Sequence, residues 1–195
     1  MINILHIIEG ALFASNTPLS VEALKKSVCP QLNLDEIKSL VNELEAHYQE
    51  RGIQLVQVAS GYRFQITSQV ADQLGTLFED KPNRFSKAFM EILALIAYRQ
   101  PITRGEIEAI RGVAVSTQTM KTLSELAWIR VVGHKEVPGK PALYATTKAF
   151  LDFFGLKNLE DLPALMDLTE LKDLNEITPI DIKEDEQVLE HEQAV

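Results

Sequence analysis

Residues that commonly perform catalytic or metal chemistry are few in this 195-residue chain. Its histidines are His6, His47, His134 and His191, and its one cysteine is Cys29. None of the histidines stands at metal-ligand spacing from another histidine or from the cysteine. The lone cysteine also excludes a disulfide framework and a thiolate zinc site. Because no catalytic constellation is present, we expect a protein without enzymatic activity, metal or cofactor.

Basic side chains offer a second kind of chemistry, the binding of phosphates or carboxylates. The net charge of the chain is −9, yet residues 81–148 hold 11 basic and 5 acidic residues. A basic face on this segment is compatible with nucleic-acid contact. The expected third helix of the segment exposes one cation and one anion, too few to read base edges, so only weak DNA contact is expected. The candidates for that contact are Lys121, Arg130, Lys135 and Lys140.

The end of the chain is acidic, with 3 basic and 13 acidic residues in 149–195. From Asp167 to Val195 it has no aromatic residue, which predicts a disordered, solvated tail. The longest apolar run, Ile92–Tyr98, is seven residues long, whereas a bilayer-spanning helix needs roughly 20. The N-terminus lacks the basic region of a signal peptide. We therefore expect a cytoplasmic protein that does not contact a membrane.

An internal repeat organises the chain. When the sequence is shifted by 83 positions, Ala11–Ala14 aligns with Ala94–Ala97, and Pro18–Ser20 aligns with Pro101–Thr103. Self-similarity of this kind indicates copies of one structural module. The sequence therefore predicts two modules of about 75 residues each.

Each module is predicted to have three helices followed by a pair of strands. Asn33 with Glu36, and Thr103 with Glu106, have the spacing of a capping box at a helix start. The third helix of the first module repeats its apolar residues with a period of 3.6. The opening helices are expected at 2–15 and 86–99, and the strand pairs at 53–59 with 62–67 and at 129–134 with 143–147.

This order predicts an α+β, mainly α fold of tandem winged-helix domains, each a helix-turn-helix core with a β-hairpin wing. The expected boundaries are 1–78 for the first domain, 79–85 for a linker, 86–166 for the second domain and 167–195 for the acidic tail.

The opening helices are apolar around most of their circumference. A small module cannot bury such a helix on all sides. The surplus apolar surface is expected to meet a second copy of the chain, a partner protein, or the other module.

From Ile96 to Val113 the sequence resembles the segregation and condensation protein B (ScpB) family. The resemblance continues through Val131–Gly133, Val137–Pro141 and Leu143–Thr147, and ends between Phe150 and Pro163. It covers about residues 1–166 and leaves out the tail.

The resemblance implies a non-enzymatic adaptor subunit of a condensin-like SMC–kleisin complex, which acts in chromosome condensation and partition during cell division. In that family the first domain forms a homodimer, the dimer binds the kleisin ScpA, and the kleisin bridges to SMC. DNA contact would then be indirect or weak, and the protein would lie in the cytoplasm with the nucleoid. The alternative is a winged-helix DNA-binding protein or transcription regulator that contacts DNA through its basic second domain.

The resemblance and the residue types together give two sets of candidate contacts. The candidates for dimerisation are Ile4, Leu5, Ile8 and Leu12. The candidates for kleisin binding, chosen in part because arginine forks suit carboxylates, are Arg99, Gln100, Arg104, Glu106, Arg111, Ile92 and Ile96. We expect that replacing Arg104 and Arg111 by Glu weakens kleisin binding and leaves the fold intact.

Overall fold

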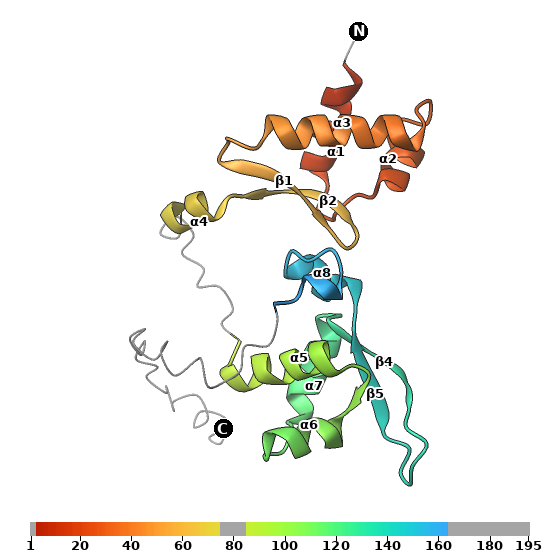
Figure 1. The fold of residues 1–195 in the computed structure, drawn as a ribbon, viewed down its shortest axis with the longest axis vertical. Coiled ribbons are helices and arrows are strands. Elements are labelled where there is room, and N and C mark those ends of the chain that lie inside the picture. The colour runs from red at the N-terminus through yellow and green to blue at the C-terminus, as the bar shows by residue number, and fades with distance from the viewer. Residues whose placement is uncertain (1–2, 75–84, 164–195) are drawn as a thin grey trace, which may run out of the picture. The chain divides into compact units, whose positions relative to one another are not determined.

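The computed structural model describes residues 3–74 and 85–163. It is a mixed α/β protein in which helices are combined with two small sheets (Figure 1). Two hydrophobic cores share no residue, one lying between Ile8 and Leu55 in the sequence and the other between Phe89 and Phe150. We call residues 3–74, around the first core, the first lobe, and residues 85–163, around the second core, the second lobe.

The first lobe consists of three helices, a β-hairpin and a short helix. Its elements are α1 (Ile4–Ala14), α2 (Val21–Ser27), α3 (Leu34–His47), β1 (Ile53–Val58), β2 (Gly61–Ile66) and α4 (Ser68–Leu74). The side chains of Asn3, Ser20 and Asn33 each accept a hydrogen bond from a backbone amide of the first turn of α1, α2 and α3. These caps satisfy amides that have no partner within the helix.

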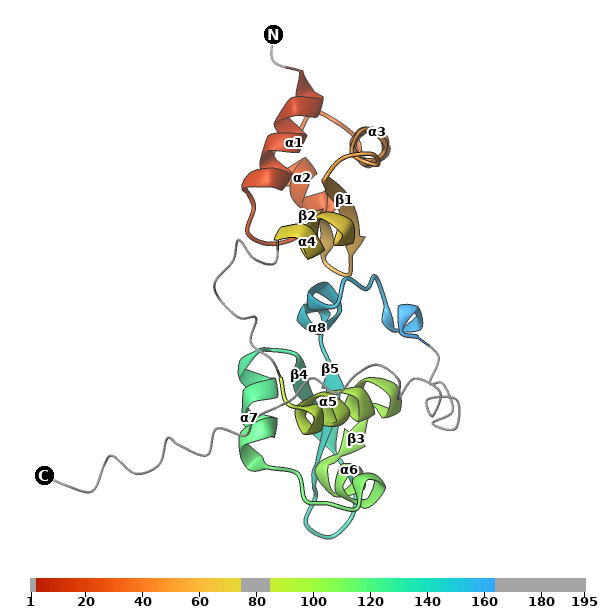
Figure 2. The same ribbon diagram turned by 90° about the vertical axis from the view of Figure 1, so that its left-hand side faces the viewer.

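Two contacts hold α1 and the residues after it to the rest of the first lobe. The Tyr48 hydroxyl, at the end of α3, donates a hydrogen bond to the Glu9 carboxylate of α1, and this bond raises the pKa of Tyr48. Between α1 and α2, Leu19 exchanges two backbone hydrogen bonds of 2.9 Å with Tyr62 of β2. Figure 2 shows α3 end-on beside α1. The apolar side chains of α1 that face this frame are therefore buried.

The second lobe repeats the order of three helices and a hairpin, with an added strand. Its elements are α5 (Lys87–Arg99), β3 (Ile102–Thr103), α6 (Arg104–Arg111), α7 (Thr117–Glu125), β4 (Ile129–His134), β5 (Ala142–Thr146), α8 (Lys148–Phe153) and the 3₁₀ turn η1 (Leu159–Asp161). Gly112 ends α6 in the left-handed conformation, with φ of 71°, which glycine adopts at little cost.

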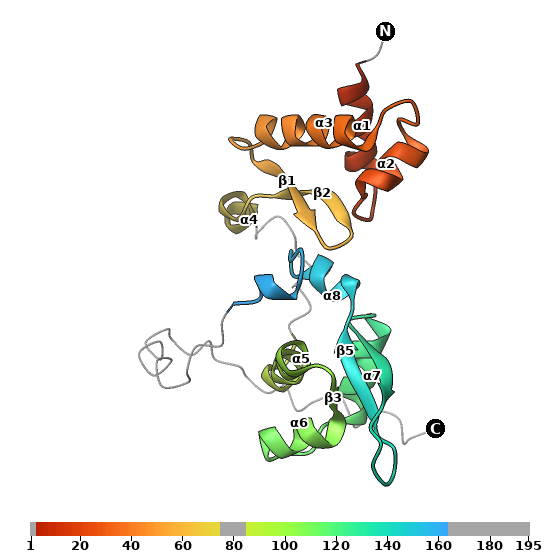
Figure 3. The ribbon, with the colours of Figure 1, turned by 45° about the vertical axis from the view of Figure 1, so that its right-hand side comes forward.

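The sheet of the second lobe has the order β3-β5-β4, with both pairs antiparallel. Ile102 lies opposite Tyr144, and Ile129 lies opposite Thr146. The register of β4 shifts at a bulge between Val131 and Gly133. Figure 3 shows that the loop joining β4 to β5 extends beyond helices α5 to α7. Strand β4 is therefore an edge strand that leads into a projecting loop.

Both capping boxes expected from the sequence are confirmed, and so is the order of three helices and a strand pair in each lobe. Two elements were not predicted, α4 and β3. Helix α4 buries none of its residues, and β3 has only two residues, so neither has a periodic pattern. The expected linker, apart from Phe85, and the expected tail lie outside the described residues, and the domain boundaries stay a prediction.

Gly61 is required where the hairpin of the first lobe meets the α1–α2 connection. Its φ is 144°, and a Cβ added there would clash with the backbone carbonyl of Leu19. We predict that Gly61→Ala lowers the free energy of unfolding by about 2–3 kcal/mol, measured by chemical denaturation. Gly105→Ala in α6 is the control, because a Cβ there meets nothing within 4 Å. Equal stability of Gly61→Ala and the wild type would contradict this account.

Candidate protein-interaction surfaces

Glu106 connects the start of α6 to the loop after β4. Its Oε2 accepts hydrogen bonds from the Thr103 amide and the Thr103 hydroxyl, both at 2.8 Å. Its Oε1 accepts one from the Lys135 Nζ at 2.6 Å. These partners, Lys135 first, lower the pKa of Glu106 to about 2. The carboxylate is therefore charged at neutral pH and already serves an internal structural contact on both oxygens.

Arg104 and Glu108 organise the connection between α6 and α7. The Arg104 Nε donates to the Glu108 Oε1 at 3.0 Å, and its Nη1 donates to the Thr117 hydroxyl at 3.1 Å. The same Glu108 oxygen accepts the Val115 amide at 2.9 Å, and this bond, followed by that from Arg104, lowers the pKa of Glu108. Glu108 thus holds Val115, two residues before the start of α7, and Arg104 spans both helices.

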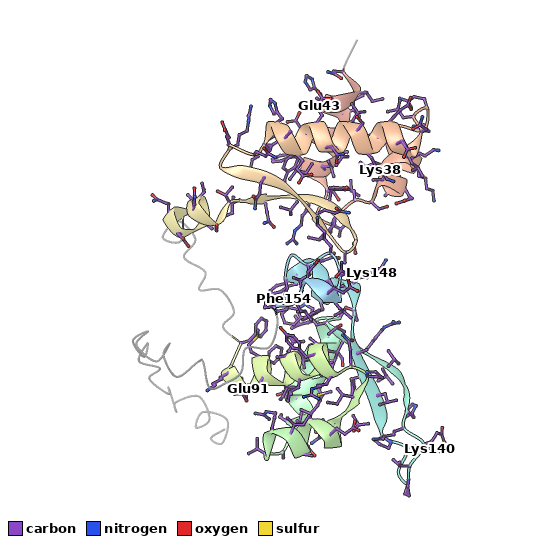
Figure 4. All side chains as sticks on the ribbon, viewed as in Figure 1. Lys38, Glu43, Glu91, Lys140, Lys148 and Phe154 are labelled. Atoms are coloured by element: carbon purple, nitrogen blue, oxygen red, sulfur yellow. The ribbon has the colours of Figure 1, made fainter. Side chains whose placement is uncertain are left out.

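Arg111, at the end of α6, pairs with Glu91 of α5 across 3.2 Å. The Arg111 side chain is only 12% exposed, and its Nε is buried without a hydrogen-bond partner among the described residues. Figure 4 shows Glu91 on α5. The sequence predicts that Arg104 and Arg111 can be replaced by Glu with the fold intact. For Arg111 the structure leads us to expect a loss of stability instead, because the new carboxylate would be buried beside Glu91.

Gln100 and Arg99, which are adjacent in the sequence, have different surroundings. The Gln100 Oε1 accepts from the amide and the hydroxyl of Thr146, and its Nε2 donates to the Ala97 carbonyl. Gln100 therefore joins the end of α5 to β5. Arg99 is exposed, and no described residue bonds to it. Of the polar kleisin candidates, Arg99 has the most freedom to contact a partner.

Ile92 and Ile96 are corrected as partner contacts. They are 2% and 0% exposed and belong to the second core. The sequence did not distinguish the buried face of α5, because apolar residues surround most of that helix. The two isoleucines hold α5 in place instead of meeting a partner.

The four dimerisation candidates on α1 differ in how deeply they are buried. Ile8 and Leu12 are 0% and 2% exposed in the first core, so they are corrected as contacts with a second chain. Ile4 and Leu5 are half-buried against that core. The exposed apolar residues of α1 are Ile7 and Phe13, which the sequence analysis missed. Their spacing could have been found by asking which apolar positions fall opposite Ile8 and Leu12 on a helical wheel.

We call the exposed side of α1 the α1 stripe. It consists of helix positions separated by three and four residues, which place them on one side of the helix: His6, Ile7, Gly10, Phe13 and Ala14. Phe13 is 73% exposed, an unusual fraction for a large aromatic side chain. The stripe has no charged residue, so it is suited to contact with another apolar surface.

The four candidates for DNA contact are only partly available. Lys121 pairs with Glu125 at 3.6 Å, and Lys135 pairs with Glu106 at 2.6 Å. Arg130 on β4 and Lys140 in the following loop are exposed, and no described residue bonds to them. Figure 4 shows Lys140 at the far end of the β4–β5 loop. Two unpaired cations provide a weak and salt-sensitive phosphate contact.

Exposed valines next to these cations were also missed by the sequence analysis. Val131 and Val132 lie on β4 and Val137 lies in the loop, and all three are exposed. An alternating strand pattern would have placed one of the two β4 valines inside, but the bulge at this point breaks the alternation. This second apolar surface therefore depends on a feature that the pattern does not predict.

Within residues 3–74 and 85–163, no group of three His, Cys, Asp or Glu side chains is placed to hold a metal ion. Cys29 is buried, and burial raises the pKa of its thiol, which keeps it protonated and unreactive. No helix in this part of the chain is long and apolar enough to cross a membrane. The features that the described residues do offer are the exposed apolar and basic surfaces.

The chain is similar to known proteins over most of its length. A family model described as segregation and condensation complex subunit ScpB matches residues 6–165. The segregation and condensation protein B homolog of Coxiella burnetii is 55% identical over 161 residues, which are 82% of this chain and 77% of that protein. The segregation and condensation protein B of Syntrophotalea carbinolica is 41% identical over 161 residues, 82% of this chain and 80% of that one. A crystal structure described as a dimer of the ScpB N-terminal domain complexed with an ScpA peptide is 25% identical, with a TM-score of 0.37, and covers 42% of this chain and 99% of that chain.

The depressed pKa of Glu106 predicts a pH-dependent contribution to stability. The unfolded carboxyl titrates near 4.5 and the folded one at about 2, so its contribution is present above 4.5 and is lost as the pH falls toward 2. Glu106→Gln is expected to be less stable than the wild type at neutral pH, with a difference that shrinks over this window. Denaturation of both proteins across the acid range measures it. Glu136→Gln, in the loop after β4 and next to Lys135, is the control, and a difference that does not change with pH would refute the role of the charge.

The burial of Arg111 predicts a loss of stability when its charge is reversed. Arg111→Glu places two carboxylates together at Glu91, so we expect the free energy of unfolding to fall by about 2–3 kcal/mol. Arg99→Glu, a matched exposed arginine, is expected to change it by less than about 0.5 kcal/mol. Chemical denaturation of the two variants gives the comparison, and equal losses would show that Arg111 is not held as described.

Proposed function

Because the chain belongs to the segregation and condensation protein B family, we propose that it is a non-enzymatic adaptor that binds the kleisin ScpA as a homodimer. In this role it forms part of a condensin-like complex and reaches SMC through the kleisin. It acts in chromosome condensation and partition, in the cytoplasm and at the nucleoid. The observation that carries the adaptor role is the exposed, uncharged α1 stripe, centred on Phe13.

The proposal includes a winged-helix assignment for each lobe. Three helices and a hairpin in this order are typical of that fold. The helix that would enter a DNA groove in the second lobe is α7, whose Lys121 is paired with Glu125. A winged helix with so few free cations on this element is better suited to protein contacts than to base reading. The boundaries 1–78 and 86–166 are part of the same proposal.

The α1 stripe is the proposed homodimer contact. In a twofold dimer the same patch serves both chains, so Phe13 of one chain would contact α1 of the other. Gly10, which has no side chain, and Ala14, which has a methyl group, lie on the same side of the helix and allow two helices to approach closely. Ile4 and Leu5, half-buried at the start of α1, would border the contact.

Phe13→Asp is expected to convert the homodimer to a monomer. A charge at the centre of an apolar interface costs several kcal/mol of association free energy. Light scattering after size exclusion should show a mass of about 44 kDa for the wild type, twice the 21.9 kDa of one chain, and about 22 kDa for the variant. Circular dichroism should be unchanged, because Phe13 lies outside the first core.

Val113→Asp is the matched control, since Val113 is an exposed apolar residue of the second lobe. This variant should remain a dimer. A dimeric Phe13→Asp protein would refute the α1 contact, and a monomeric wild type would refute the homodimer.

Binding of ScpA tests the adaptor role itself. Calorimetry with purified ScpA from the same organism should give saturable heats of binding. No further heat from catalytic turnover is expected, because the proposed adaptor is not an enzyme. Absence of heat and of any mass shift across micromolar concentrations would refute the proposed function.

A further inference from the structure

The hairpin of the second lobe carries apolar and basic side chains that the core does not use. We call this set the hairpin surface, and it consists of the exposed residues Arg130, Val131, Val132, His134, Val137 and Lys140. The Val131 side chain is 50% exposed, whereas valine side chains are usually buried in the core. Three exposed valines therefore lie within seven residues of the chain, two on β4 and one in the loop that follows it.

The hairpin surface lies on an edge strand. In the order β3-β5-β4, strand β4 pairs with β5 alone. Edge strands of this kind are usually protected by charges or by a bulge, because they attract other extended segments. Here a bulge at Val132 interrupts the register. A partner segment therefore cannot pair with the β4 backbone as a continuous extra strand. Any contact at this edge must be made by side chains.

The charges of the hairpin surface favour an acidic partner. Lys135 is neutralised by Glu106, but Arg130 and Lys140 have no bonded partner among the described residues. They precede and follow the three valines in the sequence. The one acidic residue between them is Glu136. A complementary segment would have aliphatic residues in its middle and Asp or Glu at its ends.

A protein segment fits these residues better than a nucleic acid does. Phosphates gain nothing from three valines, and two free cations release few counterions. Valines flanked by cations instead resemble the apolar core and polar rim of a protein interface. The exposed valines therefore favour a protein segment over a nucleic acid as the partner.

We propose that the hairpin surface docks a short segment of the kleisin in which aliphatic residues are flanked by carboxylates. This inference rests on the proposed function and adds to it the surface and the chemistry of the bound segment. The valines bury against the aliphatic residues, and Arg130 and Lys140 pair with the flanking carboxylates.

The test is calorimetry of full-length variants with purified ScpA. The double variant Val131→Asp, Val132→Asp should weaken binding at least tenfold. The matched control Ile110→Asp, Val113→Asp changes two equally exposed apolar residues of the same lobe and should change binding less than twofold. Circular dichroism and thermal denaturation verify that each variant is folded. If the strand variant does not fold, Val131→Ser, Val132→Ser replaces it, with at least a threefold loss expected.

The charge requirement is tested separately. Arg130→Glu should weaken ScpA binding and reduce its dependence on salt, whereas Lys87→Glu on α5, an exposed cation with no bonded partner among the described residues, should not. If wild-type protein binds ScpA and the valine variants bind equally well, the docking surface is wrong while the adaptor role stands. If wild-type protein does not bind ScpA, the proposed function fails first. A 20-base-pair DNA duplex that binds at ~0.15 M salt and loses binding in Arg130→Glu would overturn the proposal in favour of a nucleic-acid surface.

Discussion

A small lobe can bury only one side of the helix that opens it, and the rest of the molecule follows from this limit. In the first lobe, Ile8 and Leu12 take the buried side of α1. The apolar side chains at Ile7 and Phe13 are then left in solvent, because roughly 70 residues enclose too little volume to cover them. Exposed aromatic surface without charge is stabilised by contact with another protein. The burial that forms the core therefore also determines which apolar residues of α1 stay exposed.

In the second lobe, the hydrogen bonds of two glutamates connect the helices to neighbouring segments. Glu106 holds the first residues of α6 and the loop after β4 at once, through Thr103 and Lys135. Glu108 holds the segment that leads into α7 by accepting the Val115 amide. Because these carboxylates bind Lys135 and Arg104 within the lobe, the charges of these two cations are already paired. Arg99, Arg130 and Lys140 are exposed and have no bonded partner among the described residues, and Arg130 and Lys140 flank the exposed valines in the sequence.

The frame of this fold could be predicted from the sequence, because local signals set it. Capping boxes at Asn33 and Thr103 placed two helix starts correctly, and the strand pair expected at 53–59 and 62–67 is the first hairpin. The buried face of α1 could not be predicted in this way. When apolar residues surround a helix, periodicity no longer says which side is inside, and Ile8 was taken for a surface residue.

The roles of individual charged residues could not be predicted from the sequence either. Arg111 pairs with a residue 20 positions away, and Glu106 with one 29 positions away. Such pairs exist only once the helices and the sheet have packed, so residue type alone made both look like free surface groups. The ion pair of each, and the hydrogen bonds of Glu106 to Thr103, show that both residues connect elements within the lobe.

The central claim is that this chain works by joining proteins through the apolar surface that its small lobes cannot bury. The most direct measurement is the mass of the full chain in solution with and without ScpA, by light scattering after size exclusion. The account predicts a dimer of about 44 kDa alone, and a heavier complex that contains both proteins when ScpA is added. A species of about 22 kDa that ScpA leaves unchanged would contradict it.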